Sequence, residues 1–521
     1  MSPTQNRSRS ALPLLCLTGG FLVRLVPARL TFLNPDEVLH YFLSREPSLR
    51  ATYQASLTTA HPPLLILLLH YWQLFGHSEL FLRLPSLLAG LAFAWMMFLW
   101  LRRIADRSTA ITGLVLLLFS PALISVSSEV RQYALLLCFA AISLYLLDRA
   151  IEENSAAMML LSSGALYLAL LVHYSSLIFA FTLGVYTLWR LRATRSNTKV
   201  VAVWVAGQVV ALALSAFLYK THLATLQHSV LRQEIADTWL RNSIFHPGQG
   251  QVALFVVSRT VRLFRYLFSN GTIGVLALMV FIYGIGFLLL NPEPHPPDRK
   301  PAPRQLALLF ALPFLLTAAA AVTGLYPYGG TRHDIFLAAF AMSGVSFGLA
   351  RLKIPQEWLL LAVLSIALAI GNLIPFPTPP YIKPENQDRR LMNAAMAWLH
   401  REALPGSVLL TDYEGGLMLS YYPCHDRVIE IKTTHAFLHS SCGDYRVVAS
   451  SPDLWSYDPR TLPAGLQELQ LESKAGGETT VLLFQAGWID DRQAEWITQL
   501  SQLGCRNPQL FGQNIFFCRI K

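Results

Sequence analysis

The amino-acid sequence predicts a polytopic α-helical membrane protein with about 11 transmembrane helices and a C-terminal soluble α/β domain. Hydrophobic residues make up 53% of the chain and charged residues only 14%, and the mean hydropathy is +0.42. Such a composition is too apolar for a soluble multidomain protein. Eleven apolar windows have roughly the 20 residues needed to cross a bilayer. Alternating helix and strand patterns follow Ile374.

The predicted spans define the first domain, residues 1–374, and the sequence predicts no cleavable signal peptide. Arg7 and Arg9 precede the first apolar run, but no small-residue cleavage site follows it, so we expect a retained helix. The spans lie near residues 11–33, 82–101, 109–127, 131–148, 156–173, 175–190, 200–219, 272–290, 305–325, 334–350 and 356–374.

Basic residues in the connecting loops predict the orientation of these spans. Arg102, Arg149, Arg195, Arg299 and Arg351 all fall in loops on one side of the predicted bundle. Loops rich in Lys and Arg are typically cytoplasmic. An odd number of spans then places the N terminus in the cytoplasm and the C-terminal domain outside it.

The net charge of +10 does not indicate a nucleic-acid partner. Residues 376–521 carry a net charge of −3, so the rest of the chain carries +13. The basic excess therefore lies between apolar spans, where it sets orientation.

Two external segments, residues 34–75 and 220–271, are too long to be simple connectors. The first has room for short helices along the membrane surface, and its part from His61 to Phe75 is apolar. The second carries arginines among aromatic residues, a pattern typical of interfacial amphipathic helices.

The C-terminal domain, residues 375–521, shows the alternation expected of a small α/β layer domain. The sequence predicts helices over residues 391–404, 415–422 and 491–503, and strands over residues 407–411, 427–431, 479–485 and 514–520.

The most informative stretch runs from Thr31 to Tyr41, because it holds the adjacent carboxylates Asp36 and Glu37 just outside the first span. A charge near the hydrocarbon boundary is costly, so it is usually paired, hydrated or functional. We interpret Asp36 as a catalytic base. The alternative is that the pair is only a polar flank that ends the first helix.

Further polar clusters fall on the same external side. They are His61-Pro62-Pro63, Glu129 to Tyr133, His173-Tyr174 and Tyr326 to Asp334. Arginine can clamp a phosphate with two hydrogen bonds, and Gly329-Gly330 can offer backbone N–H groups. Each cluster also has a structural interpretation, since arginines reach toward headgroups, His-Tyr pairs are common at interfaces, and Gly-Gly makes turns. The shared location of carboxylates, arginines and histidines favours a binding site for a lipid-linked phosphate.

These motifs resemble the polyprenyl-phosphate-dependent integral-membrane GT-C glycosyltransferases, specifically the protein O-mannosyltransferase and aminoarabinose-transferase branch of bacteria. The resemblance covers about residues 10–350. The residues that carry it are Asp36-Glu37, His61-Pro62-Pro63-Leu64, Phe75-Gly76, Arg83-Leu84-Pro85-Ser86, Arg131-Gln132-Tyr133 and Arg332.

The resemblance implies an inverting transfer of a sugar, hexose or pentose, from a polyprenyl-phosphate donor to a lipid, glycan or protein acceptor at the outer face of the bacterial inner membrane. It implies Asp36 as the base, with Glu37 as a second catalytic residue. The donor phosphate would contact His61, Arg131, Tyr133, Arg332 and His333, and weaker candidates for the substrate pocket are His173, Tyr174 and Arg265.

A divalent metal is possible, but no cofactor is assigned. The aminoarabinose branch often has a glutamate before the Lys/His-Pro-Pro block, and this sequence has Ala60 at that position, before His61-Pro62-Pro63. The sequence therefore does not indicate a carboxylate-assisted metal site, and His61 stays a candidate contact for a phosphate or a metal.

Two other classes of protein stay open. A transporter or flippase for a lipid-linked precursor would also use external charges, but inverted repeats are not evident in the sequence. A membrane-anchored binding or scaffold protein would explain the α/β domain but not the aligned polar clusters.

The cysteines of the C-terminal domain predict two disulfides, because an external domain lies in an oxidising compartment. Four cysteines allow three connectivities, and we favour Cys424–Cys442 with Cys505–Cys518 because these partners are near in sequence. The alternatives are four buried thiols or metal ligands. Cys16 and Cys138, in apolar helices, are expected to be inert.

Overall fold

The computed structural model of the chain is described here for the residues whose placement is defined. These are residues 3–224, 240–248, 250–290, 299–352, 357–373, 387–425, 437–450, 464, 466–467, 481–487, 498, 501–502, 504–505 and 508–520. They form two compact units. Unit 1 comprises residues 1–26, 56–68 and 83–378, and unit 2 comprises residues 27–55, 69–82 and 379–521.

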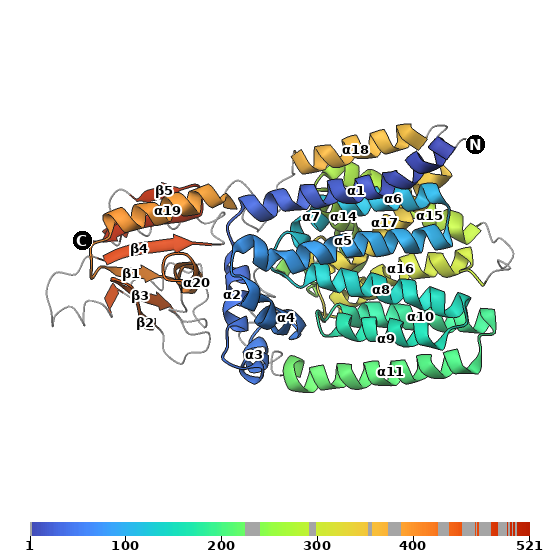
Figure 1. Cartoon of the computed structure of the whole chain (residues 1–521), viewed down its shortest axis with the longest axis horizontal. Coiled ribbons are helices and arrows are strands. Elements are labelled where there is room, and N and C mark those ends of the chain that lie inside the picture. The colour runs from blue at the N-terminus through green and yellow to red at the C-terminus, as the bar shows by residue number, and fades with distance from the viewer. Residues whose placement is uncertain are drawn as a thin grey trace. The chain divides into compact units, whose positions relative to one another are not determined.

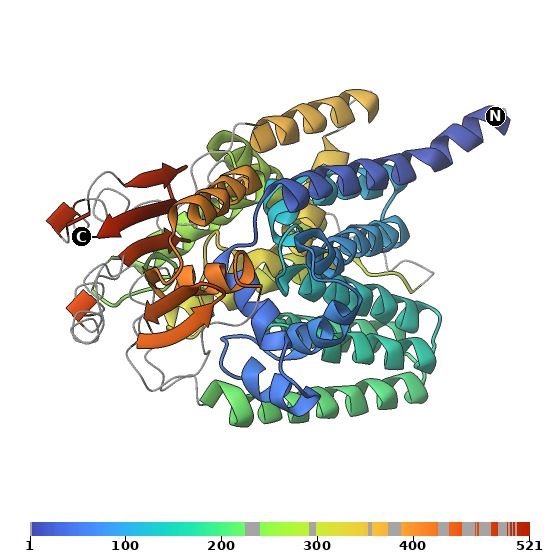
Figure 2. The same cartoon turned by 60° about the vertical axis from the view of Figure 1, so that its left-hand side comes forward.

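Unit 1 is an α-helical bundle (Figures 1 and 2), and most of its helices run roughly parallel to one another. Its elements are α1 (Pro3–Leu30), α5 (Glu79–Ile104), α6 (Arg107–Phe119), α7 (Pro121–Ser127), α8 (Tyr133–Glu152), α9 (Ala156–Leu170), α10 (Ser176–Thr194), α11 (Thr198–Leu218), η2 (Tyr219–Leu223), η3 (Arg241–Ser243), α14 (Val252–Phe268), α15 (Gly271–Leu290), α16 (Pro303–Val322), η4 (Arg332–Leu337), α17 (Ala338–Arg351) and α18 (Glu357–Leu373).

Each of the eleven predicted spans coincides with a helix or with a bent pair of helices. Within the described residues, seven helices are long and apolar enough to cross a membrane, and the count reaches eight when the pair α6 and α7 is taken as one span. Helix α9 is apolar but has only 15 residues, so length separates it from the full spans. The predicted class, a multi-span helical membrane protein, is confirmed.

The predicted span 109–127 is broken at Ser120-Pro121, where α6 and α7 meet at an angle of 57°. A break frees backbone carbonyls that water cannot reach inside a bilayer. Arg24 of α1, fully buried, supplies the missing donors. Its guanidinium donates to the carbonyls of Leu117 and Leu118 and to the hydroxyl of Ser127. This intramembrane arginine therefore has a structural role.

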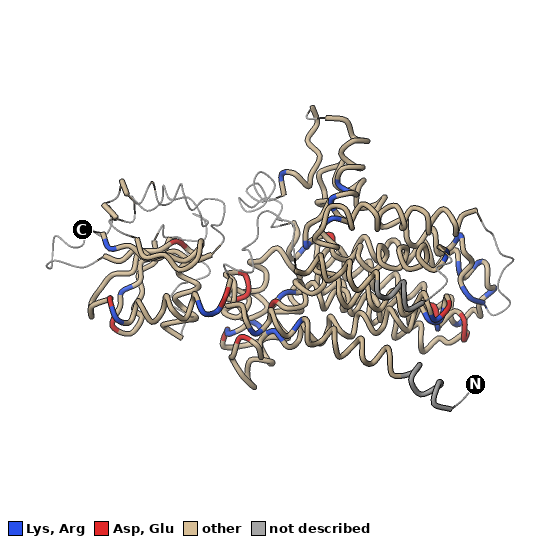
Figure 3. The backbone as a smooth tube through the Cα atoms, turned by 90° about the horizontal axis from the view of Figure 1, so that it is seen from above, with Lys and Arg blue, Asp and Glu red and all other residues tan. Residues whose placement is uncertain are grey.

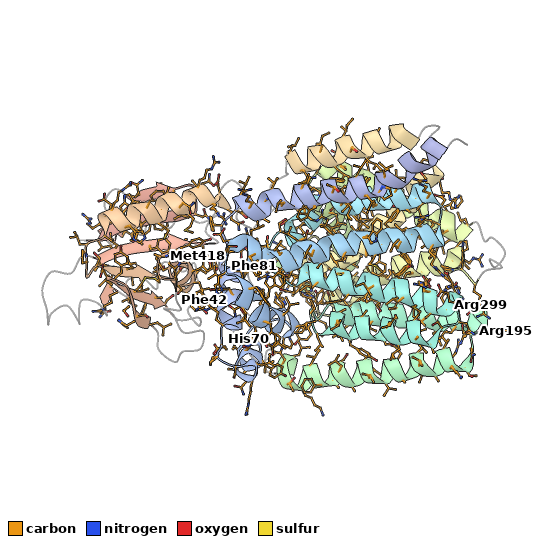
Figure 4. The ribbon with its side chains drawn as sticks, viewed as in Figure 1. Phe42, His70, Phe81, Arg195, Arg299 and Met418 are labelled. Atoms are coloured by element: carbon orange, nitrogen blue, oxygen red, sulfur yellow. A yellow bond between two sulfur atoms is a disulfide. The ribbon has the colours of Figure 1, made fainter. Side chains whose placement is uncertain are left out.

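Arginines from loops distant in sequence gather at one end of unit 1. Arg195 follows α10 and Arg299 precedes α16, and Figure 4 shows both at the same end of the bundle. The tube view of Figure 3 shows further Lys and Arg positions there, together with some acidic ones. The common end is what the predicted loops require, and its assignment to the cytoplasm stays a prediction.

Unit 2 combines a mixed sheet with helices from two parts of the chain. The N-terminal part supplies α2 (Pro35–Ser44), most of α3 (Leu49–Ser56), the end of α4 (Leu64–Trp72) and η1 (Gln73–Phe75). The C-terminal part supplies α19 (Arg389–Glu402), β1 (Val408–Thr411), α20 (Tyr413–Tyr421), β2 (Phe437–Cys442), β3 (Tyr445–Ser450), β4 (Val481–Ala486), β5 (Gln509–Phe511) and β6 (Ile515–Ile520).

The sheet has the strand order β2-β3-β1-β4-β6-β5. Strand β1 is parallel to both β3 and β4, whereas β2, β6 and β5 pair antiparallel to their neighbours. All four residues of β1 are buried, as expected for a central strand covered on both faces. The predicted α/β domain is therefore confirmed.

The sheet contains a hairpin that the sequence pattern did not predict. Strands β2 and β3 pair Cys442 with Tyr445 across the two-residue turn Gly443-Asp444, and Gly443 has a φ of +57°. A Gly-Asp pair between strands is a recognised hairpin signal. The predicted strand 427–431 and most of the predicted helix 491–503 lie outside the described residues.

Alternate residues of β6 point to opposite faces of the sheet. Phe517 packs against Phe484 and against Trp398 of α19, with ring centroids 4.8 and 4.9 Å apart. Cys518 joins the core on the other face, with Val408, Leu410, Phe437, Val448, Leu483, Cys505 and Phe516.

The structure contains the two disulfides that the sequence favoured. Cys424–Cys442 and Cys505–Cys518 have Cα atoms 5.1 and 5.7 Å apart. The second bridge lies within the sheet core. Cys138 is a buried thiol and Cys16 a partly buried one.

The first external segment differs from its predicted place in the domain division. The prediction put residues 34–75 with the membrane domain, but residues 27–55 belong to unit 2. Helix α2 packs on α20, where Figure 4 labels the buried side chains Phe42 and Met418. The amide of Phe32 donates to the carbonyl of Gln387 over 2.9 Å. These contacts, distant in sequence, tie the segment to the sheet.

Candidate active site

The polar clusters of unit 1 converge on Tyr133, the first residue of α8. Its ring centroid lies 6.3 Å from that of His61, 5.3 Å from that of His173 and 6.2 Å from that of His333. The three histidines come from two separate loops and from η4. Tyr133 itself is fully buried, so the ring acts as the fixed centre of the cluster.

Two guanidinium groups reach the same ring. Cζ of Arg131 lies 5.7 Å and Cζ of Arg332 lies 6.0 Å from its centroid. Arg131 is buried, and its carbonyl accepts a hydrogen bond from the Ser86 hydroxyl over 3.0 Å. Both arginines thus lie within cation–π distance of Tyr133. All five residues predicted to contact the donor phosphate are brought together in unit 1.

His173 is a neutral hydrogen-bond donor within this cluster. The backbone amide of Ser175 donates to its Nδ1 over 3.1 Å, which leaves the ring proton on Nε2. Burial, reinforced by the positive charge of Arg131, lowers the pKa of His173 to about 3. The imidazole therefore stays uncharged near neutral pH. It stacks on His61 with ring centroids 5.2 Å apart.

Two neighbouring residues, Gln132 and Tyr133, carry buried polar atoms that have no hydrogen-bond partner in the described part of the chain. These atoms are the hydroxyl of Tyr133 and both side-chain amide atoms of Gln132. Leaving such groups unsatisfied costs about 1–3 kcal/mol each. The arrangement therefore suits a polar ligand that supplies the missing hydrogen bonds.

The Gly329-Gly330 pair has a different role from the one suggested by the sequence. The amide of Gly329 donates to the carboxylate of Asp334 over 2.7 Å, and the amides of Gly330 and Thr331 bond the same carboxylate. Its N–H groups are thus used within the loop. Positive φ angles of 116° and 82° let Gly329 and Gly330 lie directly against Arg259 and Arg262 of α14. The expectation that they bind phosphate is corrected.

Tyr174 and Arg265, the two other weak candidates for the substrate pocket, have contacts with other parts of unit 1. The Tyr174 hydroxyl hydrogen-bonds Nδ1 of His222 in η2, and the other ring nitrogen of His222 meets the carbonyl of Thr59. Arg265 lies on α14 and packs its guanidinium against the start of α15 at Gly271. We therefore do not include Tyr174 or Arg265 in the cluster around Tyr133.

The carboxylates Asp36 and Glu37 belong to unit 2, in the first turn of α2. Asn34 caps this helix, because the Glu37 amide donates to Asn34 Oδ1 and the Asn34 amide donates to Glu37 Oε2. This reciprocal capping box occupies the fully buried Glu37. Asp36 is half-buried, so its carboxylate is the more accessible of the two.

No metal-binding group was found in the described parts of either unit. There, no three or more His, Cys, Asp or Glu side chains are placed to hold a metal ion.

Sequence reasoning missed several residues that shape the cluster. Gln132 has a buried side-chain amide without a hydrogen-bond partner among the described residues. The Ser175 amide fixes the tautomer of His173. The Tyr326 hydroxyl donates to the carbonyl of His333 over 2.9 Å. Gln132 and Tyr326 lie inside motifs that the sequence already marked. Ser175 follows the His-Tyr pair, and a Ser two residues after a His is too common to be a signal.

The chain resembles known glycosyltransferases over part of its sequence. Residues 60–220 match the family described as dolichyl-phosphate-mannose-protein mannosyltransferase. That range includes His61, Arg131, Tyr133 and His173. Among curated proteins, none matches the sequence.

Solved structures share the fold over nearly the whole chain. ArnT from Cupriavidus metallidurans in the apo state has a TM-score of 0.52 at 12% identity, covering 98% of this chain and 98% of that one. The same protein bound to undecaprenyl phosphate has a TM-score of 0.51 at 12% identity, covering 97% of each chain.

The fold and the family match define a membrane protein with the GT-C glycosyltransferase fold. The resemblance indicated by the motifs, to the protein O-mannosyltransferase and aminoarabinose-transferase type, is confirmed.

Proposed function

We propose that this protein transfers a sugar from a polyprenyl-phosphate donor to an acceptor at the outer face of a bacterial inner membrane. The observation that carries the proposal is the convergence of Arg131, Arg332 and three imidazoles on the buried ring of Tyr133. Phosphate oxygens accept hydrogen bonds and favour guanidinium donors. The similar ArnT structure that holds undecaprenyl phosphate supports this assignment.

The donor phosphate takes the hydrogen bonds that the cluster leaves open. Tyr133 Oη and the Gln132 amide are buried and unsatisfied in the described chain, and the Nε2 proton of His173 is a neutral donor. Donors fixed before the substrate binds need no reorganisation when charge develops on the leaving phosphate. Arg131 and Arg332 stabilise that charge as the glycosidic C–O bond breaks.

Asp36 is the base of the reaction. The acceptor hydroxyl or amine attacks the anomeric carbon and gives its proton to the carboxylate, while the polyprenyl phosphate leaves with the bonding electron pair. The configuration at the anomeric carbon is inverted. Glu37 holds the start of α2 through the capping box, so it positions Asp36.

The site lies outside the cytoplasm, with the N terminus inside. The basic loops that gather at one end of unit 1 support this orientation.

Binding of undecaprenyl phosphate to the purified full chain in nanodiscs tests the donor site. Arg131→Ala and Arg332→Ala should each weaken binding by about tenfold or more, since a charge-assisted hydrogen bond contributes about 1.5–3 kcal/mol. Arg192→Ala, at an exposed position in the last turn of α10, is the matched control and should bind normally. Unchanged affinity in both cluster variants would show that these arginines only reach toward headgroups.

Turnover separates transfer from transport. A transferase releases polyprenyl phosphate from a lipid-linked sugar when acceptor is present. A flippase moves the intact lipid-linked sugar between leaflets and releases none. If the lipid-linked sugar moves between leaflets and no polyprenyl phosphate is released, the protein is a transporter and the proposed transfer is wrong.

A further inference from the structure

Unit 2 contains a cavity of about 560 Å³ that the donor chemistry does not use. It is lined by residues of α2, of the segment 77–79, of the start of α19 and of the end of α20. All of these lie in unit 2. The volume falls within the range of about 300–1,000 Å³ typical of small-molecule sites.

Aromatic rings form one wall of the cavity. The rings of Tyr41 and Tyr421 meet edge to face with centroids 5.4 Å apart, and Tyr421 meets Tyr422 in the same way at 5.0 Å. The hydroxyl of Tyr421 donates to the carbonyl of His77 over 2.9 Å. These contacts hold the rings in place, and the faces of such rings carry negative potential that attracts C–H groups.

A fixed polar network forms another wall. The carboxylate of Glu79, only 6% exposed, accepts hydrogen bonds from the Tyr422 hydroxyl and from Arg389 Nε, each over 2.7 Å. The Tyr422 hydroxyl also accepts from the amide of Leu33 over 2.8 Å. Each partner therefore constrains the other, so the polar groups are oriented before a ligand arrives.

The rim adds exposed hydrogen-bonding groups. They come from Arg45, His77, Asn393 and His425. Cζ of Arg45 lies 5.5 Å from the ring centroid of Tyr41. The lining holds two arginines but a single carboxylate, and Glu79 is already paired with Arg389. The remaining positive charge favours a neutral or anionic ligand over a cationic one.

We infer that this cavity is a saccharide-binding subsite for the acceptor. A sugar ring has an apolar C–H face and a periphery of hydroxyl groups. It therefore matches aromatic faces beside oriented donors and acceptors better than a lipid chain or a plain peptide does. The inference rests on the proposed transferase function, to which it adds that the acceptor carries a sugar, preferably an acidic one.

Saturation-transfer NMR on the full chain in nanodiscs tests the subsite, with glucuronate, glucose and glucosamine as probes. Ring protons of glucuronate should receive saturation most strongly and those of glucosamine least. Tyr421→Ala should reduce the glucuronate signal about fivefold or more, on the scale of a lost aromatic contact. Tyr71→Ala, which removes a tyrosine that is 54% exposed and outside the cavity, should leave it unchanged.

Arg45→Gln keeps the test valid if Tyr421→Ala unfolds, because Arg45 is exposed and lies at the rim. It should lower the glucuronate signal toward that of glucose and leave the glucose signal intact. Undecaprenyl phosphate binding, measured on the same samples, should be normal in every variant. No saccharide signal in wild-type protein that binds undecaprenyl phosphate would overturn the subsite but not the donor site. If the wild-type protein does not bind undecaprenyl phosphate, the result counts against the proposed function.

Discussion

His61 and His173 stack on one another, with their ring centroids 5.2 Å apart and their planes inclined by 27°. One precedes α4 and the other lies between α9 and α10, so the chain between them folds back to bring the two rings together. Because His173 is buried and neutral, the stack avoids two adjacent positive charges. A neutral imidazole presents a donor to a phosphate without adding to the charge of Arg131 and Arg332.

Tyr133→Phe separates binding from folding. The buried hydroxyl has no partner among the described residues, so its removal should leave the unfolding temperature unchanged or slightly raised. Affinity for undecaprenyl phosphate should fall by about tenfold, as for one lost hydrogen bond of about 1.4 kcal/mol. Thermal unfolding and ligand binding of the same sample measure both. A destabilised variant with normal affinity would contradict a ligand-binding role for the hydroxyl.

Asp36→Asn should abolish most turnover and spare the fold. The expected loss is about 100-fold or more in the transfer rate, the usual scale for a general base, with undecaprenyl phosphate binding retained. Glu37→Gln should be milder, because glutamine also closes a capping box, whereas Glu37→Ala should destabilise by about 0.5–2 kcal/mol. Rates and unfolding temperatures are measured for all three. An inactive Glu37→Gln beside an active Asp36→Asn would exchange the two roles.

His173 predicts a pH dependence of stability. Its folded-state pKa of about 3 lies below the ordinary value of 6.5, so below about pH 6.5 the unfolded chain binds a proton that the folded chain does not. Stability is therefore unaffected by this group above that pH and falls by about 1.4 kcal/mol per pH unit toward pH 3. Unfolding temperatures from pH 7 to pH 4 should fall less steeply in His173→Gln. Parallel curves for wild type and variant would rule out this contribution.

Arg24 should be essential for stability and not for chemistry. Arg24→Met removes hydrogen bonds to the carbonyls of Leu117 and Leu118 at the break between α6 and α7, at a cost of about 1–3 kcal/mol for each carbonyl left unsatisfied. Arg29→Met, at an exposed position on the same helix, is the control. Thermal unfolding in nanodiscs should show a lower transition for Arg24→Met alone. Equal transitions would mean that other groups satisfy the broken helix.

The disulfides of unit 2 should stabilise that unit. They close loops with sequence separations of 18 and 13, for which the chain-entropy estimate gives roughly 3 kcal/mol each. Limited proteolysis after reduction should cleave residues 387–520 sooner than in the oxidised protein. Peptide mapping of non-reduced protein should find the two predicted pairs. Four alkylatable cysteines in the tail would remove the bridges and weaken the external assignment.

The elements whose signals are local could be predicted from the amino-acid sequence. Apolar runs of bilayer length mark the helices, because every backbone group there must be satisfied within the helix. The alternation after Ile374 marks β1, β4 and β6. The motifs at His61, Arg131 and Arg332 also named the residues that converge on Tyr133, since charged and aromatic side chains are rare between apolar spans.

Features that depend on contacts between distant segments became visible with the folded chain. It showed that Asp334 takes the amides of Gly329 and Gly330, that Ser175 sets the tautomer of His173, and that α2 packs on α20. The sequence does not show which distant group a backbone N–H will bond or which element a helix face will pack against. Packing of the whole unit determines which polar groups are buried and lose their hydrogen bonds to water. Most of these groups then pair within the protein, and the few that do not are available to a ligand.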